Sequence, residues 1–182
     1  MSILFNNSFN KLPADFYSKV HPEKTNNPKK LLINNSLCRE LNIDYKYLES
    51  QEGINILSGN TIHKGSDPLA MVYAGHQFGN WVPQLGDGRA HLLGEVQDID
   101  GNKLDVQLKG SGKTPYSRGG DGKAWIGPVI REYLVSEYMH NIKIPTTRSL
   151  SAVLTGDSVY REDVYPGAVL CRVSKSHIRV GT

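Results

Sequence analysis

The stretch Leu104–Gly112, which reads LDVQLKGSG, decides the fold class. Leu, Val and Leu alternate with Asp, Gln and Lys through its first six residues. Because successive side chains of a strand point to opposite faces, this alternation predicts a strand with one apolar face. Gln107 and Lys109 share the other face, and the glycines that follow end the strand.

The segments on either side of this strand complete an α+β pattern. The run Leu92–Asp98 precedes it, and the connection Ile99–Asn102, which reads IDGN, predicts a β-hairpin between the two. Three more strands are predicted farther along the chain, at Leu150–Thr155, Ser158–Tyr160 and Ala168–Val173. This order of elements predicts an antiparallel sheet with one main helix.

The main helix is predicted from Pro128 to about Asn141. Proline suits the first turn of a helix, where its missing N–H has no partner to lose. Pro145 prevents any continuation. Helical spacing places one set of residues on a single side of this helix: Ile130, Leu134, Glu137 and Tyr138.

The chain before these elements shows a less regular sequence pattern. Residues 1–68 are predicted to form an N-terminal extension of mixed structure, and residues 69–182 to form the main unit. Short helices are predicted in the extension at Pro13–Tyr17, at Asn35–Leu41 with Asn35 or Ser36 as its cap, and after Asp44 as far as about Gly53.

Charge and glycine are concentrated in one part of the sequence. The 182 residues include 21 Lys and Arg against 18 Asp and Glu, a formal net charge of +3. Six basic and two acidic residues lie between Lys103 and Arg131, and 12 of the 18 glycines lie between Gly75 and Gly127. Positive charge beside free backbone amides favours small anions as ligands. The net charge is too small for a general nucleic-acid binder.

The sequence also restricts where the protein works. No segment approaches the roughly 18 consecutive apolar residues of a membrane-spanning helix. The N-terminus lacks the basic and apolar regions of a secretory signal, so we expect a cytoplasmic protein without membrane contact. Cys38 and Cys171 lie in apolar contexts and are predicted to be reduced core thiols.

Two common glycine motifs do not fit the glycine-rich region. The run Gly110–Thr114 reads GSGKT, but a phosphate-binding P-loop would require glycine at the position of Gln107. Pro115 also prevents a helix from starting directly after Thr114. A dinucleotide fingerprint fails too, because the glycines of Leu85–Ala90 precede a strand instead of joining a strand to a helix.

A kinase-like N-lobe fits the order of elements better. In that arrangement a glycine-rich loop covers a nucleotide, a strand lysine contacts the phosphates, and a helix glutamate holds the lysine. Here the loop would be Leu85–Ala90 and the lysine Lys109, with Glu132 or Glu137 as its partner. The alternative is that the lysine and the glutamates are solvated surface residues.

Several blocks of sequence are more specific than this template. They are YAGHQFG (73–79), PQLGDGRA (83–90), QLKGSGKTPYSR (107–118), IREYL (130–134), IPTTR (144–148) and RVSKSHIRVGT (172–182). In this order, from Tyr73 to Thr182, they resemble the selenoprotein O family, which includes the YdiU-like proteins of bacteria. The resemblance implies a protein-kinase-like fold. It also implies that the protein is a pseudokinase that transfers AMP from ATP to Ser, Thr or Tyr hydroxyls of protein substrates.

The resemblance also implies residue roles. It assigns Glu132 as the ion-pair partner of Lys109. The ATP contacts that it implies are Gly86, Gly88, Arg89, Lys109, Asp121, Gly122, Arg172 and Arg179. Glycines admit a phosphate close to backbone amides, and arginines bind phosphate oxygens in pairs. From the residues alone, Asp121 either binds the nucleotide or shapes its loop.

The chain departs from the family pattern in two places. Lys123 stands where the family usually has arginine. Lysine keeps the positive charge, but it cannot donate the two parallel hydrogen bonds of a guanidinium. The run Trp125–Val129, which reads WIGPV, stands where the family usually has a basic, serine-rich run, and its Gly127-Pro128 should reshape the start of the helix that places Glu132.

The resemblance places the catalytic Asp and the Mg²⁺ ligands beyond Thr182, in a C-lobe that is absent here. We therefore expect no catalytic residue and no metal ligand in this chain. It is predicted to be the N-terminal ATP-binding part of an adenylyltransferase, unable to catalyse the reaction alone. The alternative is a non-catalytic remnant that binds a nucleotide or a protein partner.

Overall fold

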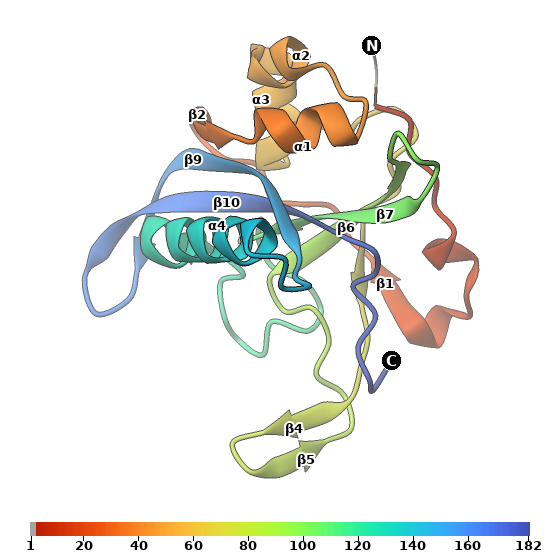
Figure 1. The fold of residues 1–182 in the computed structure, drawn as a ribbon. Helices are drawn as coiled ribbons and strands as arrows, with labels where there is room; N and C mark the ends of the chain where they lie inside the picture. The colour runs from red at the N-terminus through yellow and green to blue at the C-terminus, as the bar shows by residue number, and fades with distance from the viewer. Residues whose placement is uncertain (1–2) are drawn as a thin grey trace.

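The computed structural model describes residues 3–182 and shows an antiparallel sheet with helices on both faces (Figure 1). The strands are β1 (Tyr17–Lys19), β2 (Lys29–Ile33), β3 (Leu69–Met71), β4 (Gly75–Gln77), β5 (Asn80–Val82), β6 (Ala90–Gln97), β7 (Lys103–Lys109), β8 (Ala124–Trp125), β9 (Arg148–Tyr160) and β10 (Val164–Ser174). The helices are α1 (Asn35–Glu40), α2 (Tyr45–Glu49), α3 (Gln51–Ser58) and α4 (Ile126–Asn141), with 3₁₀ turns at Phe9–Lys11 and Ala14–Phe16. The predicted α+β class with an antiparallel sheet is confirmed.

The main sheet has the strand order β1-β3-β6-β7-β10-β9-β2, and β8 pairs with β10 beside this path. Strands β4 and β5 form a separate hairpin that projects from the body (Figure 1). The predicted hairpin of β6 and β7 is present, and the Asp98 carboxylate closes its turn by accepting the backbone N–H groups of Asp100 and Asn102 at 2.9 and 2.8 Å.

Side chains alternate between the two faces of the sheet, so each strand contributes to two separate parts of the core. On β10, Val169 and Cys171 pack into a cluster with residues of α1, α2 and α3, whereas Ala168 and Leu170 pack with Val129 of α4. The same alternation on β7 buries Val106 and Leu108 in the first cluster. Gln107 and Lys109 therefore share the other face, as the sequence pattern predicted, and this face is the one that α4 covers.

Residues of the N-terminal segment complete this core. Strand β2 pairs with β9 and β1 pairs with β3, so both edges of the sheet come from residues before 34. Helix α1 is capped by Asn34, whose side chain accepts the Leu37 N–H at 3.1 Å, instead of by Asn35 or Ser36. The segment after Asp44 forms two helices, because Ser50 ends α2 and caps α3. The division of the chain at residue 68 stays a prediction.

The structure shows which side of α4 packs and corrects the predicted division of β9. Helix α4 buries Val129 and Ser136, while Leu134 and Tyr138 are exposed. Ser136 lies 2.8 Å from the Ser149 hydroxyl, and Val129 packs against the sheet together with the partly buried Ile126 and Tyr133, so the packed face of α4 mixes polar and apolar residues. The predicted strands 150–155 and 158–160 form one continuous strand, since Gly156 adopts a positive φ of 77° within β9.

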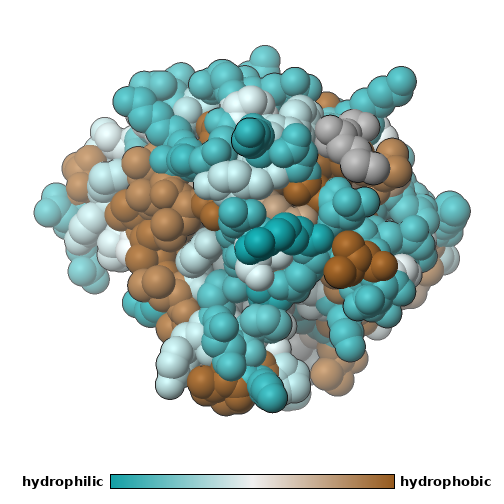
Figure 2. Space-filling model, turned by 45° about the horizontal axis from the view of Figure 1, so that its top comes forward, coloured by the Kyte–Doolittle hydropathy of each residue, from teal (hydrophilic) through white to brown (hydrophobic). Residues whose placement is uncertain are grey.

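On the face shown in Figure 2, hydrophilic residues surround a few patches of apolar ones. Among residues 3–182 no helix is both long enough and apolar enough to span a membrane.

Glu137 joins α4 to the neighbouring elements. Its carboxylate accepts hydrogen bonds from Arg148 Nε and Nη2 at 3.0 Å, from the Ser149 N–H at 2.8 Å and from the Asn34 amide at 2.7 Å. Burial alone would raise the pKa of Glu137, but these donors and the charge of Arg148 hold it below the ordinary value of 4.5. Glu137 is thus the partner of Arg148, and it does not reach Lys109.

We expect Glu137→Gln to lower the free energy of unfolding by roughly 3 kcal/mol near neutral pH, because in a largely buried site Arg148 loses one of its two carboxylate partners and keeps only Glu40. A carboxylate with a depressed folded pKa stabilises above its unfolded pKa, and this stabilisation is lost as pH falls through the folded pKa. The difference between wild type and variant in urea unfolding should therefore shrink from about pH 7 to about pH 3. An equal difference at both pH values would contradict this assignment.

Candidate functional site

One cavity collects the residues that the sequence singled out. It has a volume of about 740 Å³ and lies between the loop before β6, the end of β7, the loop before β8 and the strand β10. Every residue expected to contact the nucleotide lines it: Gly86, Gly88, Arg89, Lys109, Asp121, Gly122, Arg172 and Arg179. The fold thus brings together positions that are up to 93 residues apart in the chain.

The charge of this cavity suits an anion. Seven basic side chains line it and only two carboxylates do, Asp87 and Asp121. The basic residues are Arg89, Lys109, Arg118, Lys123, Arg161, Arg172 and Arg179. A concave site with so much unbalanced positive charge attracts polyanions such as a triphosphate.

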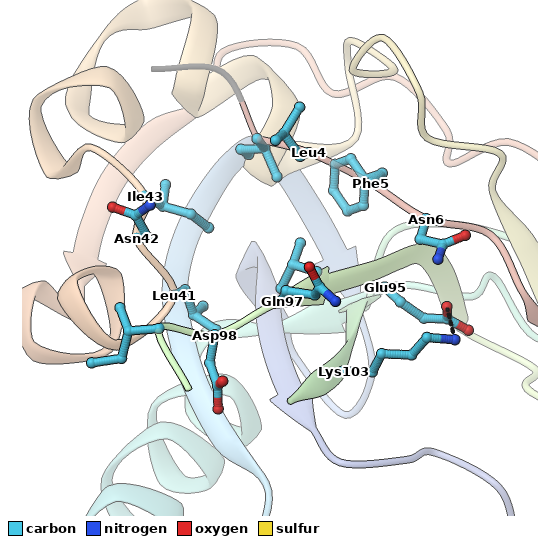
Figure 3. Close-up of a pocket in the computed structure, with 13 residues that line it drawn as sticks. Leu4, Phe5, Asn6, Leu41, Asn42, Ile43, Glu95, Gln97, Asp98 and Lys103 are labelled. Atoms are coloured by element: carbon cyan, nitrogen blue, oxygen red, sulfur yellow. Dashed lines mark ion pairs between the residues drawn. The ribbon is translucent and has the colours of Figure 1, made fainter. Parts of the chain in front are cut away.

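A second large cavity has a different character (Figure 3). It has a volume of about 710 Å³ and lies at the turn end of the β6–β7 hairpin, against the N-terminal segment. Lys103 is its only basic residue, and Lys103 Nζ lies 3.5 Å from a carboxylate oxygen of Glu95. With one basic side chain against seven, this cavity offers an anion nothing comparable to the basic cluster at the other end of the hairpin.

Lys109 and Glu132 meet at the floor of the basic cavity. Lys109 Nζ lies 2.5 Å from Glu132 Oε2, and Arg172 Nη1 lies 3.2 Å from Glu132 Oε1. Burial, with Arg172 nearby, lowers the pKa of Lys109 below its usual value. Burial would raise the pKa of Glu132, but the hydrogen bond and charge of Lys109 lower it overall. Glu132 therefore holds two cations at one wall of the cavity, and Gly127-Pro128 has not displaced it.

A polar chain that sequence reasoning missed leads away from this pair. Gln107 Oε1 accepts hydrogen bonds from Arg172 Nε at 2.9 Å and Nη2 at 2.6 Å, and Gln107 Nε2 donates to Asp87 Oδ2 at 2.9 Å. Gln107 and Asp87 are buried, with 0% and 5% of their surface exposed. Burial raises the pKa of Asp87, against the opposing charges of Arg179 and Arg172. The alternation on β7 marked the face of Gln107, but no sequence signal pointed to its partners.

The glycines of the loop before β6 are required by a neighbouring loop. A Cβ on Gly86 would lie 2.3 Å from Cγ of Tyr116, and a Cβ on Gly88 would lie 2.6 Å from the Tyr116 carbonyl oxygen. Ser117 Oγ also donates to the Gly88 carbonyl at 2.6 Å. We expected these glycines to make room for a phosphate. In the structure they allow two loops of the cavity to pack together.

Asp121 has a protein partner that the sequence did not indicate. Arg161, at the β9–β10 turn, donates to both carboxylate oxygens of Asp121 at 2.8 Å and to the Lys123 carbonyl at 3.0 Å. Arg161 lowers the pKa of Asp121 by its hydrogen bonds. Lys123, in the position where the family usually has arginine, lies 3.5 Å from Asp157. These contacts favour the loop-shaping role of Asp121.

The remaining arginines face the cavity in different ways. Arg179 lies over the ring of Tyr73, 5.4 Å from its centroid, and donates to the His177 carbonyl at 3.0 Å. Within residues 3–182 the guanidinium of Arg89 has no ion pair or side-chain hydrogen bond, so its donors are available to a ligand.

In the part of the chain from 3 to 182, no three His, Cys, Asp or Glu side chains gather in a way that could hold a metal. We therefore assign no step to a metal held by these residues.

The chain is similar to known proteins along almost its whole length. Residues 1–182 match the family model described as "Protein adenylyltransferase SelO". Proteins named "Protein nucleotidyltransferase YdiU" are 60% identical in Nitrobacter hamburgensis, over 99% of this chain, and 59% and 57% identical in Rhodopseudomonas palustris and Rhizobium meliloti, over 98%. The chain spans only 36% of the length of each of these relatives.

Proposed function

This chain belongs to the SelO family of protein adenylyltransferases, and from that premise we propose that it is the N-terminal, ATP-binding part of such an enzyme. The enzyme would transfer AMP from ATP to hydroxyl side chains of other proteins. The observation that carries the proposal is the cavity in which six further basic side chains accompany the Lys109–Glu132 ion pair.

We propose further that the sheet and α4 correspond to a kinase-like N-lobe. Lys109 ends a central strand, Glu132 lies on the only long helix among residues 3–182, and a glycine loop borders the same cavity. A strand lysine, a helix glutamate and a glycine-rich loop are the parts that this lobe uses to hold a nucleotide. Magnesium would be held by residues outside the part of the chain described.

The basic cluster suits AMP transfer. When a hydroxyl oxygen attacks the α-phosphorus, the bond to the bridging oxygen breaks and pyrophosphate leaves with the negative charge. Basic groups around the β- and γ-phosphates stabilise that charge where it develops. Arg89, Arg172 and Arg179 can contact several phosphate oxygens at once, and all three stay charged.

Two labels of ATP test the reaction class. With a protein extended to the length of the relatives, we expect label at the α-phosphorus to reach protein hydroxyls and label at the γ-phosphorus to stay in pyrophosphate. Transfer of the γ-label would show a phosphoryl-transferring kinase instead. Binding of ATP without transfer of either label would favour the non-catalytic remnant.

A further inference from the structure

We propose that Gln107 is a positioning residue: its side-chain amide orients Arg172 for phosphate binding, and Asp87 determines which way that amide points. This inference rests on the proposed function, because it takes the phosphates of ATP as the anion that Arg172 binds. It adds two buried residues that do not themselves contact the nucleotide.

The backbone register makes this contact possible. Gln107 of β7 and Arg172 of β10 are directly paired across the sheet, so their side chains leave the same face at adjacent positions. The Gln107 carbonyl oxygen holds the Nε and Nη2 edge of the guanidinium, and Glu132 holds Nη1 at 3.2 Å. A guanidinium has five N–H donors, so donors on both terminal nitrogens remain free in a side chain that lines the cavity.

The chemistry of the three groups permits only one arrangement. An ionised carboxylate accepts hydrogen bonds and does not donate, while a guanidinium donates and does not accept. Gln107 lies between Asp87 and Arg172, so its NH₂ group must face the carboxylate and its oxygen must face the guanidinium. The reverse orientation would leave buried groups unpaired, which is costly. Asp87 therefore fixes the orientation of an otherwise symmetrical-looking amide.

A neutral amide is also better suited than a carboxylate to orient a phosphate-binding arginine. A carboxylate at position 107 would hold the same guanidinium edge, but it would cancel the charge that attracts the phosphates. It would also repel the Asp87 carboxylate, because the side chain at position 107 lies within 2.9 Å of Asp87 Oδ2, where Gln107 now donates a hydrogen bond. Glutamine immobilises Arg172 and keeps its charge available.

A double-mutant cycle on the 182-residue chain tests the proposal. We expect Gln107→Met to weaken ATP and inorganic tripolyphosphate binding about tenfold, because Arg172 loses its orientation. Adenosine binding should not change. In the Arg172→Met background, Gln107→Met should add no further loss, since Gln107 acts only through Arg172. An additive loss, or an equal loss for adenosine, would overturn the proposal.

Matched variants control for folding. Gln97→Met changes the same residue type at an exposed position on the adjacent strand and should leave ATP binding unchanged. Asp87→Asn keeps the shape but lets the amide turn over, so it should cause a smaller loss that is also selective for phosphates. A loss for adenosine equal to that for ATP in Asp87→Asn would overturn the role of Asp87.

A readout without ATP separates this proposal from the proposed function. The Nε–H of Arg172, identified by its absence from the spectrum of Arg172→Met, should give a protected NMR signal in wild type. In Gln107→Met the signal should move to the position of exposed arginines or disappear through exchange with water. If wild type binds neither ATP nor tripolyphosphate, the proposed function fails for this chain. In that case the Nε–H signal alone tests the positioning role of Gln107, and an unchanged signal in Gln107→Met overturns that role.

Discussion

Replacement of Lys109 by methionine is expected to weaken ATP binding by about 100-fold, which corresponds to about 2.7 kcal/mol. Lys109 is the cation at the floor of the cavity, and its ammonium group lies 2.5 Å from Glu132. The variant loses a charge-assisted contact to phosphate. It also leaves Glu132 with only Arg172 as a partner, so a less balanced carboxylate repels the triphosphate.

Calorimetry with ATP measures this loss, and Lys103→Met is the matched control. Lys103 begins the same strand, but it lies at the far end of the hairpin and pairs with Glu95. Its replacement should leave ATP affinity unchanged. Arg89→Ala should also weaken ATP binding, because Arg89 lines the cavity with its donors available. Unchanged affinity in Lys109→Met, with wild-type thermal stability, would remove Lys109 from the ATP site.

The central hairpin and the main helix could be predicted because their patterns are local. The strand β7 alternates cleanly over its whole length, and the start of α4 is marked by a proline. The edge strand β2 reads KKLLI and has no alternation, so only its pairing with β9 makes it a strand. Strand β1, with three residues, depends in the same way on β3. Tertiary pairing decides such segments, and a linear pattern does not contain it.

In the candidate site, too, some features could be predicted from the sequence and others could not. Resemblance supplied the residues that line the cavity, and alternation supplied the shared face of Gln107 and Lys109. The partners of these residues arise from contacts across the sheet. Arg161 reaches Asp121 only because the β9–β10 turn returns to the loop before β8, and Gln107 meets Arg172 only through the register of two strands. Helical spacing grouped Leu134 and Tyr138 of α4 but did not show which side packs, and the structure buries Val129 and Ser136 instead.

Gly122→Ala is expected to lower the free energy of unfolding by about 4 kcal/mol. Gly122 has a φ of 67°, which is unfavourable for a residue with a Cβ by about 1–2 kcal/mol. An added Cβ would also lie 2.0 Å from the Gly112 carbonyl oxygen, so the backbone of one loop must move, at a further cost of about 1–3 kcal/mol. The Gly112 N–H donates to the Gly122 carbonyl at 3.1 Å, and this hydrogen bond is strained by the same movement.

Gly119→Ala separates the two contributions. Gly119 lies in the same loop with a φ of 81°, but an added Cβ would meet no atom within 4 Å. Its replacement should cost only the backbone term, about 1–2 kcal/mol. Urea unfolding of both variants measures the difference. Equal losses would mean that the contact between Gly122 and Gly112 is not tight. A larger loss for Gly122→Ala, joined by weaker ATP binding, would show that this contact holds the loop in the shape that the cavity requires.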